Sequence, residues 1–345
     1  MRNARVALSC SLPNTGISEM VRASRTRCYR GGILTDEGFA LAEVSEHLEA
    51  PGAVIWVDLC QPDLSDLARL ADELGLHELA VEDAITLQQR PKLDRYPDHL
   101  FLSAYAVGFD PVTALATTSE IAAFVTERAF VTVHDDENAD LDAIVARWDS
   151  APDLARNGVA FLLHGLLDVL VDGYFDAVEA LDQGIEELED LLFLPRADQA
   201  TVQRRSYELR KSLVVLRRVI LPMREVVNTL LRRDLHLQME RMGPYFQDVY
   251  DHVLRVMEWT DSLRDLATSI LEANLAIQGN RLNVITKKVT GYAAIIAVPT
   301  AVTGFYGQNI PYPGFGQIDG FYASTAVIIG LSGLLFVLFK RNDWI

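Results

Sequence analysis

Two uncharged stretches near the C-terminus constrain this chain more than any other feature. Residues 320–339 form a run of 20 uncharged residues, and residues 289–318 form another uncharged run just before it. A helix needs about 20 apolar residues to cross the hydrocarbon core of a bilayer. We therefore predict two transmembrane helices, over residues 289–307 and 320–339, joined by a loop at 308–319.

The charges around these stretches predict their orientation. Basic pairs at 287–288 and 340–341 flank the two spans, whereas the loop at 308–319 contains no lysine or arginine. Basic residues concentrate on the cytoplasmic side of membrane proteins. We expect a multi-pass protein of the cell (inner or plasma) membrane with both termini, including residues 340–345, in the cytoplasm.

The first span and the turns before it carry one face of mostly small or polar residues, which we call the polar stripe. Its members are Asn283, Thr286, Val289, Thr290, Ala293, Ala297, Thr300 and Gly304. The opposite face carries larger side chains, among them Tyr292, Ile295 and Phe305. This asymmetry is typical of a helix with lipid on one side and protein or water on the other. The stripe is either a helix-packing seam or the lining of a pore, and a pore requires an oligomer because two spans cannot enclose a path.

A long helical pattern leads into the first span. Residues 245–305 are interrupted only by three glycines and one proline, and about 60 helical residues at 1.5 Å each would reach about 90 Å. We predict a stalk helix over 244–288 that continues into the membrane. Acidic residues recur on it every seven positions, at Asp251, Glu258, Asp265 and Glu272. In an oligomer, Asp265 and Glu272 would line an acidic vestibule; in a monomer, they would belong to an ordinary wet face.

The rest of the chain predicts an α/β domain followed by long helices. Dense apolar runs predict strands at 53–59, 100–109, 120–126 and 129–134, with a helix at 63–74 after the first of them. Long helical patterns at 159–193 and 197–233 carry opposite charge and predict an antiparallel hairpin. We expect a flexible tail at 1–30, a cytoplasmic α/β domain at 31–150 and the hairpin within 151–243. The fold class is thus an α-rich integral membrane protein.

The charge balance limits the classes of partner. The net charge is −17, and four basic and two acidic residues from position 287 onward leave −19 on residues 1–286. Such a domain repels nucleic acid and attracts cations, although acidic surfaces also serve solubility alone. The three cysteines have no metal-ligand spacing and fit a reducing compartment. His134 and the three acids after it follow a strand as an ordinary polar loop does, so we do not expect an enzyme.

Four segments resemble one known family. Residues 304–309, GFYGQN, are similar to the Tyr-Gly-Met-Asn signature that ends the first span of the CorA family of divalent-cation channels, with Gln308 in place of Met. Residues 77–96, 209–227 and 244–253 resemble other parts of that family. The resemblance covers the chain from about residue 50. The departure at Gln308 concerns ion preference more than fold.

The resemblance implies a homopentamer in the lipid bilayer, with the first span around the pore and the second outside it. It implies Mg²⁺ as the usual ion, with Co²⁺ or Ni²⁺ as substitutes, and a selectivity filter at Gly307, Gln308 and Asn309. Asp83 and Asp248 match positions where the family holds a regulatory divalent ion between neighbouring subunits. Amide and hydroxyl oxygens along the polar stripe suit a Mg²⁺ ion that keeps its water shell.

Three hypotheses for the function follow. The first is a Mg²⁺ channel regulated by cytoplasmic divalent ions, and the second is a zinc, cobalt or nickel transporter of the same superfamily. The third, from another class, is a non-conducting membrane-anchored divalent sensor or scaffold. Neither span contains histidine or cysteine, which counts against a soft-ligand zinc site in the membrane.

Overall fold

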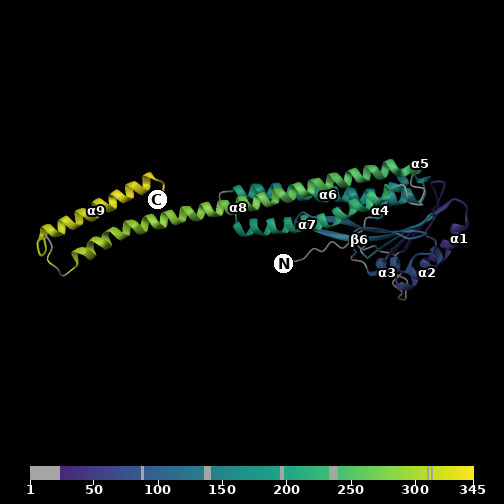
Figure 1. Ribbon diagram of the computed structural model, residues 1–345, viewed down its shortest axis with the longest axis horizontal. Helices are drawn as coiled ribbons and strands as arrows, with labels where there is room; N and C mark the ends of the chain where they lie inside the picture. The colour runs from purple at the N-terminus through teal and green to yellow at the C-terminus, as the bar shows by residue number, and fades with distance from the viewer. Residues whose placement is uncertain are drawn as a thin grey trace, which may run out of the picture. The chain divides into compact units, whose positions relative to one another are not determined.

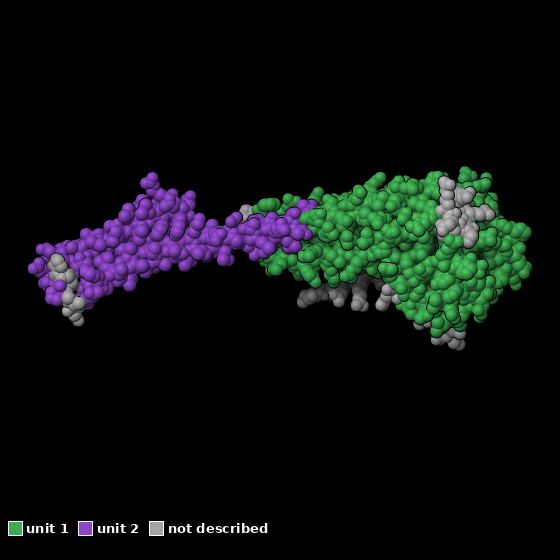
Figure 2. All heavy atoms as spheres, in the orientation of Figure 1, with its two compact units in different colours: residues 1–265 green, residues 266–345 purple. Residues whose placement is uncertain are grey.

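The computed structural model describes residues 24–86, 89–135, 141–194, 198–232, 240–308, 311 and 314–345. The chain divides into two compact units, Met1–Asp265 and Leu266–Ile345, coloured separately in Figure 2. Asn309, the last residue of the signature, lies outside the described residues, as do Asp136 and Glu137 of the polar loop after His134.

A seven-stranded sheet forms the centre of the first unit. Its strand order is β2-β1-β3-β7-β6-β5-β4, with β3 and β7 parallel and the other neighbours antiparallel. The strands are β1 (Ser24–Arg30), β2 (Ile33–Glu37), β3 (Ala53–Cys60), β4 (Lys92–Arg95), β5 (Leu100–Asp110), β6 (Leu115–Val125) and β7 (Ala129–His134). All six residues of β7 are buried, because helices cover both faces of the sheet at its centre, and this is why β3 and β7 read as continuous apolar runs.

Short helices cover one face of this sheet (Figure 1). They are α1 (Val44–Glu49), α2 (Leu64–Leu74) and α3 (Glu78–Thr86). Leu67 and Leu70 of α2 and Ala80 and Ala84 of α3 pack in one buried cluster with strand residues such as Phe124. Asp63 caps the start of α2 by accepting hydrogen bonds from two backbone N–H groups, which fixes where the predicted helix begins.

Two short helices and two long ones cover the other face. They are α4 (Leu141–Ser150), α5 (Pro152–Ala155), α6 (Val159–Phe193) and α7 (Gln199–Leu230). The indole of Trp148 packs edge-on against Trp56 of β3, with ring centroids 4.9 Å apart. Gly184 of α6 and Leu209 of α7 face each other, so the two long helices pack against one another.

The prediction of a flexible tail up to residue 30 is wrong, because Ser24–Arg30 is strand β1. Thr26 and Cys28 point into the core, while Arg27 between them binds both carboxylate oxygens of Asp149, at 3.0 and 3.1 Å. The arginines made this segment read as a polar tail. Their partners lie far along the chain, so the local sequence does not disclose the strand.

Two helices are long and apolar enough to cross a membrane. α8 (Gly243–Tyr306) is a single 64-residue helix, as the stalk prediction required, and α9 (Ile318–Arg341) has 24 residues. In the first unit, α8 packs on the helical hairpin: Trp259 donates to the carboxylate of Asp182 at 3.2 Å, and Arg217 contacts Asp261 at 3.0 Å.

We expect Gly165→Ala to destabilise the first unit by about 2–3 kcal/mol. A Cβ at Gly165 would overlap the indole of Trp148, which is fully buried and donates to the Leu162 carbonyl at 3.2 Å. Denaturant unfolding followed by tryptophan fluorescence measures the change in the free energy of unfolding. Gly173→Ala on the same helix is the matched control, because its Cβ would lie 3.7 Å from the nearest atom, an ordinary van der Waals contact. Equal stability of the two variants would contradict this packing.

Candidate ion path and cation sites

The polar stripe of α8 is exposed in the single chain along its whole length. All eight of its residues are exposed. The α9 helix and the residues after it pack on another face of α8. A Cβ on Gly291 would lie 3.0 Å from Ile345 and 3.7 Å from Phe339. Three further residues of this face of α8 are half-buried, Ala294, Ile295 and Val298. The stripe is therefore not the seam that joins the two spans of one chain. A seam between subunits and a pore lining remain the two alternatives.

Two hydroxyl groups, one on the stripe and one beside it, donate hydrogen bonds to the backbone of α8. Thr300 donates its hydroxyl proton to the Ile296 carbonyl at 3.0 Å, and Thr303 donates to the Pro299 carbonyl at 2.8 Å. Each hydroxyl proton is thus committed to the helix backbone, and the oxygen lone pairs remain as acceptors. The water shell of a hydrated cation presents hydrogens outward, so an accepting oxygen at Thr300 suits a hydrated ion better than a donor would.

The signature at the end of α8 closes the helix tightly. The Gly307 N–H donates to the Thr303 carbonyl at 2.8 Å, and the Gln308 N–H donates to the Phe305 carbonyl at 3.3 Å. A Cβ on Gly307 would come within 3.0 Å of the Thr303 carbonyl oxygen. Gly307 is not among the glycines with positive φ, so a close approach to backbone, rather than a left-handed turn, accounts for glycine at this position.

The acidic residues predicted for a vestibule are exposed in the single chain. Asp265 and Glu272 both point away from the packed side of α8, but the Asp265 carboxylate lies 3.1 Å from the guanidinium of Arg264. This pair partly neutralises Asp265. Glu272 is the stronger candidate of the two for attracting cations.

Asp83 and Asp248, the predicted regulatory pair, do not meet within one chain. Asp83 lies on α3, on one face of the sheet, whereas Asp248 lies on the part of α8 that packs with the helices of the other face. Within the described ranges, no group of three or more histidine, cysteine or acidic side chains is arranged to hold a metal. A site that uses both carboxylates must therefore form between chains.

A lysine that the sequence analysis missed controls the charge at Asp83. The Lys92 ammonium lies 2.7 Å from Asp83 and 2.7 Å from Asp94. Burial lowers the pKa of Lys92, but its hydrogen bonds to the two carboxylates outweigh burial and leave that pKa raised. Lys92 lies in residues 77–96, one of the segments that resemble the CorA family, and that resemblance was the available signal. Asp248 has a weaker neighbour, His252, whose Nδ1 is 3.6 Å away.

Residues 51–341 match the family described as "CorA-like Mg2+ transporter protein". The chain belongs to the CorA family. It is 29% identical over 293 residues to a protein named "Cobalt/magnesium transport protein CorA" from Thermotoga maritima, covering 84% of this chain and 83% of that protein. CorA-family proteins are membrane transporters, and the two candidate spans of this chain fit that class.

Other relatives extend the comparison in fold and in ion. The solved CorA magnesium transporter of Methanocaldococcus jannaschii shares the fold with a TM-score of 0.76 and 23% identity, covering 95% of this chain and 100% of that chain. A protein named "Zinc transport protein ZntB" from Pectobacterium carotovorum is 22% identical over 261 residues, covering 74% of this chain and 77% of that protein. The family therefore includes both magnesium and zinc transporters, and membership alone does not assign the ion.

Proposed function

We propose that this CorA-family chain forms a homopentameric channel that carries hydrated Mg²⁺ into the cell. The observation that carries the proposal is the exposed polar stripe, which α9 leaves uncovered along the whole of the first span. Five copies of α8 around one axis would turn the stripe into a continuous lining of accepting oxygens and small side chains. The same channel would admit Co²⁺ or Ni²⁺ as substitutes, since they resemble Mg²⁺ in size.

The filter proposed for this channel is Gly307, Gln308 and Asn309 at the external mouth. Mg²⁺ gives up its water reluctantly, so neutral amides that accept hydrogen bonds from its water shell can select it without holding it too tightly to release. Charged rings would bind a divalent ion more strongly. Both termini lie in the cytoplasm in this proposal, and the mouth faces outward.

Regulation is proposed to come from a divalent ion between Asp83 of one chain and Asp248 of its neighbour. The bound ion would screen the repulsion between the two carboxylates and hold neighbouring chains in a closed arrangement. When internal Mg²⁺ falls, the ion leaves and the pore opens. Glu272 then raises the local cation concentration at the inner end of the path.

Growth of cells lacking their own Mg²⁺ uptake systems tests the transport role. We expect expression of this chain to restore growth in medium with low Mg²⁺, and expression of a chain truncated before α9 to fail. A non-conducting sensor or scaffold would leave growth unrestored although the full-length protein reaches the membrane. That result would contradict the proposed channel function.

We expect Lys92→Met to make the channel more sensitive to internal Mg²⁺. Without the ammonium 2.7 Å away, the Asp83 carboxylate is no longer neutralised and should bind a divalent ion more tightly. An ion pair of this exposure contributes on the order of 1 kcal/mol, so the half-inhibiting Mg²⁺ concentration should fall roughly fivefold. Flux into vesicles loaded with graded Mg²⁺ measures it, with Lys211→Met on the exposed face of α7 as the control; unchanged inhibition in Lys92→Met would argue against Asp83 as a ligand.

A further inference from the structure

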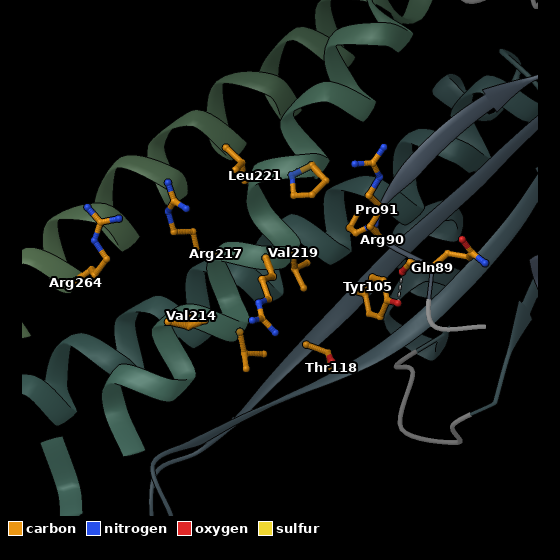
Figure 3. A pocket seen from close by; sticks show the side chains of 13 residues that line it. Gln89, Arg90, Pro91, Tyr105, Thr118, Val214, Arg217, Val219, Leu221 and Arg264 are labelled. Carbon is orange, nitrogen blue, oxygen red and sulfur yellow. Dashed lines mark hydrogen bonds between the residues drawn. The ribbon is translucent and has the colours of Figure 1, made fainter. Parts of the chain in front are cut away.

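Two of the segments singled out in the sequence are not used by the ion path, and they meet at one pocket of the first unit. Figure 3 shows this pocket, which has a volume of about 820 Å³. Gln89, Arg90 and Pro91 come from the segment 77–96, whereas a row of residues from Val214 to Pro222 comes from the segment 209–227. Two stretches far apart in the chain therefore form one cavity, which lies wholly within residues 24–265.

The pocket is basic in an acidic protein. Four arginines line it, Arg90, Arg217, Arg218 and Arg264, and none of its lining residues is acidic, although acids outnumber bases by 48 to 31 in the whole chain. Arg217 and Arg264 share the carboxylate of Asp261, at 3.0 and 3.4 Å. Arg90 and Arg218 are exposed and form no ion pair with any residue that the structure describes. Positive charge thus remains available to a ligand.

One wall of the pocket is apolar. Pro91, Val214, Val219, Leu221 and Pro222 all contribute to it, and Val214 and Leu221 are 41% and 39% exposed. In the view of Figure 3, Arg217 and Arg264 lie on one side of the cavity and Arg90 and Tyr105 on the other. Pockets for small organic ligands typically combine about 300–1,000 Å³ of volume with mainly apolar walls and a few polar groups. This cavity has a volume in that range, an apolar wall and a few polar groups.

A buried carboxylate anchors the backbone that carries Arg90. Glu120 is 6% exposed and accepts hydrogen bonds from the Gln89 N–H at 3.2 Å, from Tyr105 at 2.8 Å and from Ser103 at 2.8 Å. The Tyr105 hydroxyl also contacts the Gln89 carbonyl. Burial, together with the Glu120 carboxylate, raises the pKa of Tyr105, so this hydroxyl stays protonated and acts as a donor. The segment Gln89–Arg90–Pro91 is therefore tied to the sheet at the edge of the pocket.

We propose that this pocket binds a nucleoside polyphosphate. The apolar wall would receive the base and sugar, and the planar guanidinium groups of Arg90 and Arg218 would pair with phosphate oxygens, for which their fork of donors is matched. The negative charge of a phosphate chain complements the positive charge of the arginines. The volume of the pocket suits a ligand of nucleotide size. The inference concerns a site separate from the ion path and does not depend on which cation is carried.

Isothermal titration of the full-length protein in detergent with ATP tests this proposal. The titration is done with EDTA present, so that divalent-ion sites contribute nothing. We expect one saturable ATP site per chain and at least about tenfold weaker binding of adenosine and of tripolyphosphate, because each lacks one half of the recognition. The absence of saturable ATP binding would overturn the proposal. That result is expected if acidic side chains of a neighbouring subunit fill the pocket.

Variants of the exposed arginines locate the site. Arg90→Gln combined with Arg218→Gln should weaken ATP binding by about tenfold or more, because each change removes charge-assisted hydrogen bonds to phosphate oxygens. Arg210→Gln on the exposed side of α7, outside the pocket, should bind as the parent does. Size-exclusion chromatography of each variant shows that assembly is retained. Unchanged ATP affinity in the double variant, or tripolyphosphate binding as tight as that of ATP, would contradict the assignment.

Discussion

Asn309→Gly should reduce Mg²⁺ flux by about a hundredfold or more while the protein still assembles and reaches the membrane. Five amides at the mouth of the proposed pore would be lost together, and each hydrogen bond to the ion's water shell contributes about 0.5–1.5 kcal/mol. Glycine also ends helices well, so the variant keeps any terminating role of this position. Uptake of Mg²⁺ by proteoliposomes measures the effect.

The loop before α9 offers the control for this variant. Gln317→Gly removes an exposed amide just before α9, and we expect its flux to equal that of the parent. If Asn309→Gly also conducts normally, Asn309 only terminates the helix and the filter must be sought elsewhere on the chain. Loss of assembly in Asn309→Gly would likewise contradict the filter role, because it would show a structural one.

The double variant Asp83→Asn with Asp248→Asn should shift the half-inhibiting internal Mg²⁺ concentration upward by about tenfold or more. Amides bind divalent ions more weakly than carboxylates do, and removing two negative charges weakens the electrostatic attraction that holds the ion between the chains. The channel would then remain open at Mg²⁺ concentrations that close the parent. Flux measured against internal Mg²⁺ gives the shift directly.

A single charge change elsewhere separates this site from a general effect of net charge. Asp72→Asn alters an exposed acid on α2, the helix before α3, and should leave inhibition unchanged. Equal shifts in Asp72→Asn and in the double variant would assign the effect to the overall charge of the domain. Unchanged inhibition in the double variant would remove Asp83 and Asp248 from the regulatory proposal.

The sequence predicted those elements whose signal is local. The apolar runs of β3 and β7, the long helical patterns and the two spans are all found close to the predicted bounds. Strands β1, β2 and β4 were missed because they are short and carry charged side chains, as in Lys92–Arg95. Such strands are fixed by pairing with distant segments: β1 joins β3, and its Arg27 binds Asp149. Propensity within the segment does not report these contacts.

The same distinction holds for the functional residues. Helical spacing alone predicted the polar stripe, and the structure adds that α9 leaves it exposed. The contact between Asp83 and Lys92 joins α3 to β4 and depends on the fold. The arginine pocket was beyond prediction for the same reason, because Arg90 and Arg218 become neighbours of one cavity only after the sheet and the hairpin pack together.

Ion flux into proteoliposomes, compared side by side for Mg²⁺, Zn²⁺ and Co²⁺, tests the central claim most directly. The amide filter and the absence of histidine and cysteine from the sequence of both spans predict that Mg²⁺ enters fastest, that Co²⁺ enters more slowly and competes with it, and that Zn²⁺ enters least. Zn²⁺ flux that exceeds Mg²⁺ flux in the same vesicles would contradict the Mg²⁺ channel and assign the chain to zinc transport. The absence of flux for all three ions would contradict conduction itself.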